Sequence, residues 1–493
     1  MKLSIITILF ISISNAAISQ QPLGSLTAEF TLGLEWSVHS RFIPQTNFDL
    51  TTPSVNGYSR TGHKYLDGYI HPIGYGATLK LIVSNQALIN GNISYIWEIK
   101  GIKKDDQTNN PFYYTKTTTK KTLYAGSSTA VDTEPDVLAI PLFPYRGTYK
   151  VKVIATTKSP ATGEIKIVKE LERSIEIKDY LIVVMGDSFA SGEGNPDNAG
   201  NYDVFTDDDK AVWLEPKAHR SYKGALSLIA KRIEADDPHS CVTFINVATS
   251  GAKTSNGLLF QQHEDWQAKG QVEEVKEYVK DRKVDMILLA IGLNDFGKVD
   301  GMSELVMATV DPTPPEFQQS SQYRFAKDIV RNIEFRYDEV YDKIINTLNC
   351  KNVVLFQMPV QFMRNASGNL TDGCGLLTTM ENEDILKLED LGNQLIGKQK
   401  QICTKYQWTY IDGIRDLFKN HGYCAGNQSW FMFIRNSQES QGDVNGAIHP
   451  NELGHKKIAE MAFPFIKRRL EQIIVPTQPG NTATLSSENQ FKQ

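Results

Sequence analysis

The stretch Leu181-Ile-Val-Val-Met-Gly-Asp-Ser-Phe-Ala-Ser-Gly-Glu-Gly194 decides how this chain of 493 residues is interpreted. Its apolar, β-branched run stops at Gly186, which indicates a strand buried on both faces of a parallel sheet. Ligands of open α/β sheets bind beyond the carboxyl ends of such strands, so Ser188 stands where a nucleophile would lie. The segment is not the G-x-S-x-G turn of α/β-hydrolases, because Ala190 replaces the second glycine. Taken alone, it is equally a glycine-rich turn with an incidental serine.

The chain after this stretch alternates between strands and helices. Apolar runs predict buried strands at 242–248, 284–291, 352–358 and 408–411. Amphipathic segments predict helices at 222–234, 272–280, 321–348, 380–406 and 452–474. Such alternation predicts an α/β domain with a mostly parallel sheet and helices on both faces.

The chain before this stretch has the pattern of short antiparallel strands. We predict them at 77–84, 93–99, 137–142, 147–154 and 164–177. Tyr149, Val151 and Val153 alternate with lysines, the period of a half-buried strand, and this density of strands predicts an all-β sandwich-like domain. Trp97 and the Gly147-Thr-Tyr149 segment resemble immunoglobulin-like modules. The module is expected to be a spacer or packing partner, or else to bind a glycan or a surface.

The N-terminus has the pattern of a secretory signal peptide. Lys2 is followed by an apolar core at 3–13 and by a small-x-small site at Ala17-Ile18-Ser19. This core is too short to span a bilayer, and no later stretch is long enough, so the sequence predicts an exported protein without a transmembrane segment. A net charge of −5 without a long basic run excludes nucleic acid as an expected partner.

These patterns divide the chain into five parts. They are a signal peptide (1–19), an N-terminal extension (20–67), the β-sandwich module (68–178), the α/β domain (179–475) and a disordered tail (476–493). Oligomeric state is not indicated.

The five cysteines all lie after residue 240. None forms a C-x-x-C pair, which argues against a zinc site or a redox motif. In an exported protein, one or two disulfides are expected among the last four, at Cys350, Cys374, Cys403 and Cys424, with at least one thiol left free. The connectivity stays open.

Three further polar segments follow predicted strands or precede the last helix. Gly251 follows the strand that ends at Val247, and Asn294 follows the strand that ends at Ile291. His449 directly precedes the final helix, for which Asn451 is a suitable N-cap.

Together these segments resemble the SGNH hydrolases, also called the GDSL esterase/lipase family, in an exported bacterial-type branch. The resemblance covers residues 179–475 and rests on Gly186-Asp-Ser188, Gly251, Gly292-Leu-Asn294-Asp and His449-Pro450, which occur in the family's order. It implies a flavodoxin-like domain in which Ser188 attacks an ester carbonyl after His449 takes its proton. The implied oxyanion hole consists of the N–H groups of Ser188 and Gly251 and the side-chain amide of Asn294. Asn294 could instead form a turn within its own loop.

The chain departs from the family at the acidic residue. The family has an aspartate three residues before the histidine, where this chain has Gly446; Asp443 lies six residues before His449. Either a longer loop lets Asp443 reach the imidazole, or a backbone carbonyl near Gly446 orients His449 in a serine–histidine dyad.

Other polar residues receive structural interpretations. Asp187 is expected to stabilise its turn, and His455 to pack or cap. His219 and Arg220 either form a salt bridge or line the substrate site. The acidic run 207–209 is expected to be a solvated loop rather than a calcium site. The chemistry calls for no metal and no cofactor.

The sequence therefore predicts a secreted serine esterase that acts on lipid or small acyl esters. Deacetylation of an acylated glycan is the alternative, favoured if the β module binds carbohydrate. A non-catalytic surface or binding protein on a hydrolase scaffold is a third hypothesis, against which the four intact site segments argue.

Overall fold

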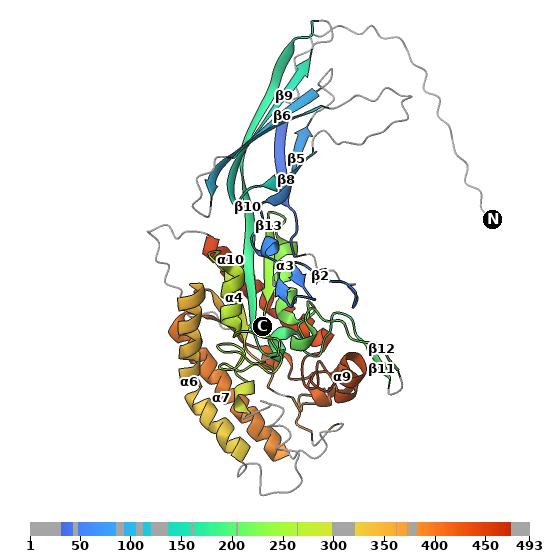
Figure 1. Cartoon of the computed structure of the whole chain (residues 1–493), viewed down its shortest axis with the longest axis vertical. Helices are drawn as coiled ribbons and strands as arrows, with labels where there is room; N and C mark the ends of the chain where they lie inside the picture. The colour runs from blue at the N-terminus through green and yellow to red at the C-terminus, as the bar shows by residue number, and fades with distance from the viewer. Residues whose placement is uncertain are drawn as a thin grey trace, which may run out of the picture.

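The computed structural model describes residues 31–42, 48–84, 93–104, 112–119, 137–158, 162–203, 206–263, 265–297, 321–360, 362–371, 374 and 382–474. The predicted signal peptide and C-terminal tail lie outside these ranges. An elongated β part stands on an α/β part, and one long strand, β10 (Ile165–Gly186), runs through both (Figure 1).

The α/β part is built on five parallel strands. They are the second half of β10 with β13 (Ser240–Asn246), β14 (Met286–Ala290), β15 (Val353–Phe356) and β16 (Thr409–Ile411). Their order in the sheet is β13-β10-β14-β15-β16. Numbered from β10, this is 2-1-3-4-5, the flavodoxin-like order. The predicted fold class is confirmed.

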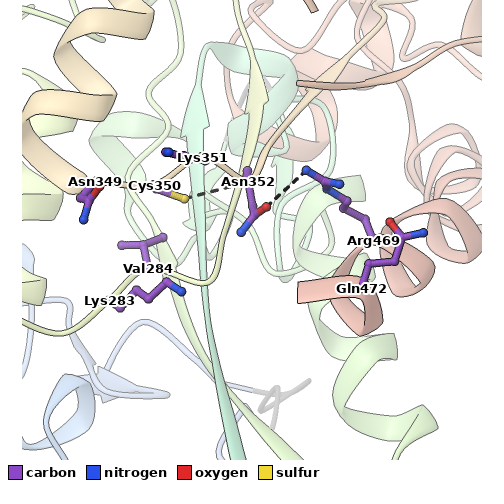
Figure 2. Close-up of a pocket in the computed structure, with 8 residues that line it drawn as sticks. All are labelled: Lys283, Val284, Asn349, Cys350, Lys351, Asn352, Arg469 and Gln472. Atoms are coloured by element: carbon purple, nitrogen blue, oxygen red, sulfur yellow. Dashed lines mark hydrogen bonds between the residues drawn. The ribbon is translucent and has the colours of Figure 1, made fainter. Parts of the chain in front are cut away.

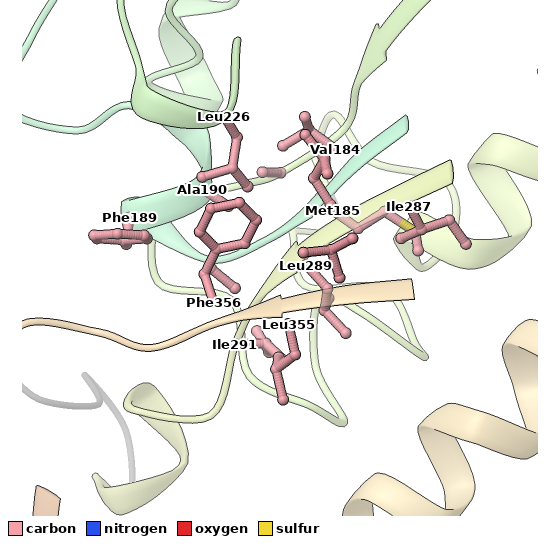
Figure 3. Packing of buried hydrophobic residues seen from close by; sticks show 14 of the residues in the cluster. Val184, Met185, Phe189, Ala190, Leu226, Ile287, Leu289, Ile291, Leu355 and Phe356 are labelled. Atoms are coloured by element: carbon pink, nitrogen blue, oxygen red, sulfur yellow. The ribbon is translucent and has the colours of Figure 1, made fainter. Parts of the chain in front are cut away.

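Helices cover both faces of this sheet. α3 (Ala225–Asp236) contacts α10 (Glu452–Ile474), whereas α6 (Ser321–Leu348) contacts both α4 (Gln271–Val279) and α7 (Asn382–Tyr406). Right-handed crossovers place α3 on the face opposite to the other three connecting helices. Apolar side chains of the central strands fill the space between the sheet and these helices (Figure 3). Residues 181–185 are all inaccessible to solvent.

The β part consists of two antiparallel sheets. The first sheet has the order β1-β5-β8, and its strands are β1 (Thr31–Val38), β5 (Tyr75–Ser84) and β8 (Val137–Phe143). The second has the order β10-β9-β6-β7, in which β10 is joined by β9 (Gly147–Lys158), β6 (Ile93–Lys104) and β7 (Tyr113–Thr119). Trp97 is buried in the core between them. The hydroxyl of Tyr149 donates to the carbonyl of Tyr145, 2.5 Å away. The immunoglobulin-like assignment stays a prediction.

The strands predicted at 164–177 and after 181 are one continuous strand. Ile175 and Ile177 are buried in the sandwich, and Leu181 is buried in the α/β core. Because the apolar alternation stays in phase across the polar residues between them, the strand does not need to break. The first half of β10 pairs antiparallel with β9 and the second half pairs parallel with β13 and β14. The two parts therefore share a strand.

The segment before the β module contacts both parts. Its strand β1 belongs to the sandwich, whereas β2 (Ser54–Val55), β3 (Tyr58–Ser59), β4 (Lys64–Tyr65) and α1 (Asp67–Ile70) pack on the α/β core. The tyrosine hydroxyls at 65 and 69 accept hydrogen bonds from the N–H groups of Asn246 and Phe244. These bonds cover the edge of β13, which would otherwise be open to pairing with another chain.

Shorter elements complete the described chain: α2 (Ser188–Ser191), β11 (Asn201–Asp203), β12 (Thr206–Asp209), the 3-10 helices Pro216–Ala218, Asn294–Phe296 and Tyr423–Gln428, α8 (Ile414–Leu417) and α9 (Ile434–Gln441).

Cys374 and Cys424 form a disulfide, which confirms the expected bridge among the last four cysteines. Cys241, Cys350 and Cys403 are free and buried. Within the described ranges, no helix has the length and apolar character that crossing a membrane requires.

A buried ionic cluster fastens the two parts where β10 passes between them. The carboxylate of Asp179 is 2.8 Å from guanidinium nitrogens of both Arg41 and Arg282 and accepts from the hydroxyl of Thr243. Arg146, from the loop before β9, donates to the carbonyl oxygen of Asp179. Burial alone would raise the pKa of the Asp179 carboxyl, but the two arginines outweigh it and the pKa lies below its usual value.

We expect Asp179→Asn to destabilise the protein by about 3–5 kcal/mol, because two buried guanidinium groups lose their counter-charge. Since the folded pKa of Asp179 is depressed, its stabilisation is present above the unfolded pKa and is lost as pH falls. Urea unfolding of the variant and the wild type at pH 7 and pH 3 measures this, and the difference should shrink at pH 3. Asp67→Asn, which removes an exposed partner of Lys280, is the control. An Asp179→Asn variant as stable as this control would contradict the prediction.

Candidate active site

Ser188 lies on a sharp turn at the carboxyl end of β10. Gly186 has φ 135°, and a Cβ atom there would lie 1.9 Å from the carbonyl oxygen of Ala290 on β14, so only glycine fits. α2 begins at Ser188, and the Asp187 side chain accepts from the N–H of Phe189 as its N-cap. Asp187 therefore stabilises the turn, as expected. Ser188 itself is 8% exposed.

Gln271, the first residue of α4, holds the end of β10 in place. Its side-chain oxygen accepts from the N–H of Gly186 at 2.8 Å, and its side-chain nitrogen donates to the Gly186 carbonyl at 2.9 Å. Nothing in the sequence marks this residue, because a glutamine at a helix start carries no signal of its distant partner.

His449 meets Ser188 from a loop far along the chain. Its Nε2 lies 2.7 Å from Ser188 Oγ, and its Nδ1 lies 3.1 Å from the carbonyl oxygen of Ala447. A carbonyl can only accept, so Nδ1 carries the proton and Nε2 accepts from the serine hydroxyl. Burial lowers the pKa of His449, which keeps the imidazole neutral, and so free to accept a proton, near neutral pH. A hydrogen bond from the N–H of Met432 to the His449 carbonyl fixes the loop.

Asp443 makes its contacts elsewhere. Its Oδ1 accepts from the side-chain amide of Gln441 at 2.7 Å and from the N–H of Asn445 at 2.8 Å. Its Oδ2 is 3.6 Å from Nε2 of His219. The described contacts of His449 instead favour the second alternative, orientation by a backbone carbonyl, and the carbonyl is that of Ala447, next to Gly446.

The loops of Gly251 and Asn294 lie beside the serine turn, because β13 and β14 flank β10. The side-chain amide of Asn294 donates to the carbonyl of Ala252, 3.2 Å away, so the two loops touch. Asp295 joins them again by accepting from the hydroxyl and the N–H of Thr254. All residues predicted for the oxyanion hole thus come from adjacent strand ends.

Arg220 and His219 contact different segments. The buried guanidinium of Arg220 donates to the carbonyls of Ala248 and Val247 and so supports the loop that carries Gly251. His219 pairs through Nδ1 with the carboxylate of Glu193 at 2.7 Å. The expected salt bridge thus involves His219, whereas these contacts of Arg220 are to backbone carbonyls.

Glu193 was not singled out in the sequence. Its place in the glycine-rich block after Ser188 was the available signal, but its partner His219 is distant in sequence. Ligand atoms of Glu193, His219 and Asp443 lie within 4.8 Å of one another, a spacing that metal sites also have. The amide nitrogen of Gln441 donates to both carboxylates, so hydrogen bonds already account for the cluster. The side chains of the acidic run 207–209 lie outside the described residues.

His455 has a structural position, as expected. It is fully buried in α10, where Nδ1 accepts from the N–H of Ala225 and Nε2 donates to the carbonyl of Glu193. Burial lowers its pKa to about 4, so it stays neutral.

A cavity of about 400 Å³ lies at the other edge of the sheet (Figure 2). Its lining includes Lys283 and Val284 just before β14, Asn349–Asn352 just before β15, and Arg469 and Gln472 on α10. Ser188 follows the carboxyl end of β10, whereas this cavity lies at the amino ends of β14 and β15. It is therefore separate from the serine–histidine pair.

The sheet order is that of a flavodoxin-like domain, and the Ser188–His449 pair lies at the carboxyl edge of this sheet. Residues 182–462 match the GDSL-like lipase/acylhydrolase family, and the chain belongs to it. The protein is therefore an ester hydrolase. No curated protein sequence is significantly similar to the chain.

Solved structures with a similar chain course include two from Streptomyces. The extracellular lipase of Streptomyces rimosus is 20% identical, with a TM-score of 0.41, over 59% of this chain and 99% of that one. Phospholipase A1 of Streptomyces albidoflavus is 20% identical, with a TM-score of 0.40 and the same coverage. A carbohydrate esterase is 11% identical, with a TM-score of 0.27, over 89% of this chain and 98% of the other.

Proposed function

We propose that the protein is a secreted serine esterase that hydrolyses lipid or small acyl esters through an acyl-enzyme on Ser188. The observation that carries this proposal is the 2.7 Å contact between Ser188 Oγ and His449 Nε2 at the carboxyl edge of the sheet. Secretion is supported by the signal-peptide pattern of residues 1–19 and by the Cys374–Cys424 disulfide.

The proposed reaction uses His449 first as base and then as acid. His449 takes the hydroxyl proton while Ser188 Oγ attacks the ester carbonyl, and the imidazolium then protonates the departing alkoxide. Water hydrolyses the acyl-enzyme by the same route. Negative charge on the carbonyl oxygen would be stabilised by the N–H groups of Ser188 and Gly251 and by the Asn294 amide, donors worth about 10²–10³ each in kcat.

The substrate is tested with p-nitrophenyl esters of graded acyl chain length and with an acetylated glycan. Turnover of the medium and long chains supports the lipid-ester proposal. Turnover that falls steeply with chain length, together with release of acetate from the glycan, would favour the alternative of a carbohydrate acetyl esterase. No turnover of any ester would overturn the proposed reaction.

The Ala447 carbonyl, not Asp443, is proposed to orient His449. We therefore expect Asp443→Asn to lower kcat by about tenfold or less, far from the roughly 10⁴-fold loss that follows amidation of a triad aspartate. The asparagine retains the oxygen that accepts from Asn445, so the loop should keep its shape. A loss near 10⁴-fold with an unchanged melting temperature would show that Asp443 is the acid after all.

A further inference from the structure

We propose that Glu193 takes the place of the missing triad aspartate by acting on His449 through space, as a positioning residue that does not touch the substrate. The inference rests on the proposed esterase function of Ser188 and His449. It explains why the chain keeps a charged carboxylate buried beside its active site.

Glu193 is held as a buried charge. Its side chain is inaccessible to solvent, yet its two oxygens lie 2.8 and 2.7 Å from Nδ1 of His219. The amide of Gln441 donates to the same carboxylate at 2.7 Å. A buried carboxylate without such donors would be protonated. Trp213 stacks on the His219 ring with centroids 4.7 Å apart, which holds the ring in this place.

The backbone around Glu193 touches both members of the catalytic pair. Its N–H donates to the carbonyl of Ser188 at 3.0 Å. The next residue, Gly194, faces His449 so closely that an added Cβ would lie 3.2 Å from the histidine Cβ. The partner amide of Gln441 in turn packs on Gly446, whose carbonyl accepts from the His449 N–H. Glu193 therefore lies between the nucleophile turn and the histidine loop.

The charge of Glu193 supplies what the Ala447 carbonyl lacks. When His449 takes the serine proton it becomes a cation, and its direct partner on Nδ1 is only a neutral dipole. Burial lowers the pKa of His449, and the negative charge of Glu193 opposes that effect; the His219 cation works in the same direction as burial but more weakly than Glu193. Burial would raise the pKa of Glu193, but His219 holds it below its usual value. Glu193 in turn raises the pKa of His219 against the effect of burial, so both shifts favour the ion pair. The Glu193 carboxylate then stabilises the imidazolium that forms on His449.

The test is Glu193→Gln, which keeps the size and removes the charge. We expect kcat to fall about tenfold because the base becomes weaker, with KM within about twofold of the wild type. The acid limb of the kcat/KM profile should move to lower pH, and the NMR titration of His449 should move with it. A purely structural role would change stability and kcat but would leave this limb in place. An unmoved limb in a folded variant would overturn the inference.

A second pair of variants covers the case in which Glu193→Gln does not fold. Glu193→Asp and Glu193→Asn have the same shape and differ in charge, so the limb should move in the asparagine variant relative to the aspartate variant. Glu234→Gln is the matched control: this buried carboxylate accepts from the N–H of Val242 at the amino end of β13, and its loss should lower stability without moving the limb. Wild-type turnover is measured first, since its absence would refute the esterase proposal itself, whereas wild-type turnover with an identical profile in the variants refutes only the role of Glu193.

Discussion

Ser188→Ala should reduce ester hydrolysis by a factor on the order of 10⁶ in kcat, the loss seen when a serine hydrolase loses its nucleophile. The serine oxygen is the atom proposed to bond to the acyl group, and the residual rate would come from the oxyanion donors and substrate binding. Stability should change little, because the turn depends on Gly186, the Asp187 cap and Gln271 rather than on the Ser188 hydroxyl. Initial rates with p-nitrophenyl butyrate and a thermal melt measure both quantities.

The matched control for this variant is Ser240→Ala. Ser240 is also a buried serine, but it lies at the amino end of β13, where its hydroxyl donates to the carbonyl of Asp237. It should retain wild-type kcat. A Ser188→Ala enzyme with more than about one per cent of wild-type kcat would mean that another residue forms the acyl-enzyme or that water attacks the ester directly.

His449→Gln should cost nearly as much as Ser188→Ala, because removing either member of a nucleophile–base pair has almost the full effect. The glutamine amide can still hydrogen-bond, but it cannot take the serine proton. The wild-type kcat/KM should rise with pH as His449 loses its proton and reach its plateau near neutral pH, since burial lowers the pKa of this imidazole below its ordinary value. The variant should lack this limb.

His71→Gln serves as the control for His449→Gln. His71 contacts the carbonyl of Tyr278, outside the serine–histidine pair and its supporting loops, so its loss should leave the acid limb unchanged. If the limb persisted in His449→Gln, the titrating base would be a different group.

The sequence predicted the parts of the site that depend on strand ends. Ser188, Gly251 and Asn294 each follow an apolar run, and the carboxyl ends of adjacent parallel strands lie together. The apolar runs and amphipathic segments predicted the strands and long helices of the flavodoxin-like domain within a few residues. Glycine at position 186 marked the turn because no other residue fits against Ala290.

The rest depended on contacts between segments far apart in the chain. The orientation of His449 is decided by how the loop 443–449 folds, and its spacing alone left both Asp443 and a carbonyl open. Glu193 pairs with His219 and Gln441, which lie 26 and 248 residues away. The continuity of β10 was not predicted because the polar segment around Asp179 resembles a linker, whereas three-dimensional packing gives its carboxylate two arginine partners.

The most direct measurement of the proposed mechanism is covalent labelling with a fluorophosphonate, followed by intact mass analysis and peptide mapping. The wild type should gain one adduct on Ser188, at a rate that rises with pH along the same acid limb as ester hydrolysis. Ser188→Ala should gain none, and His449→Gln should react slower by several orders of magnitude. An active wild-type enzyme that stays unlabelled, or that carries its adduct on another residue, would contradict the assignment of Ser188 as the nucleophile.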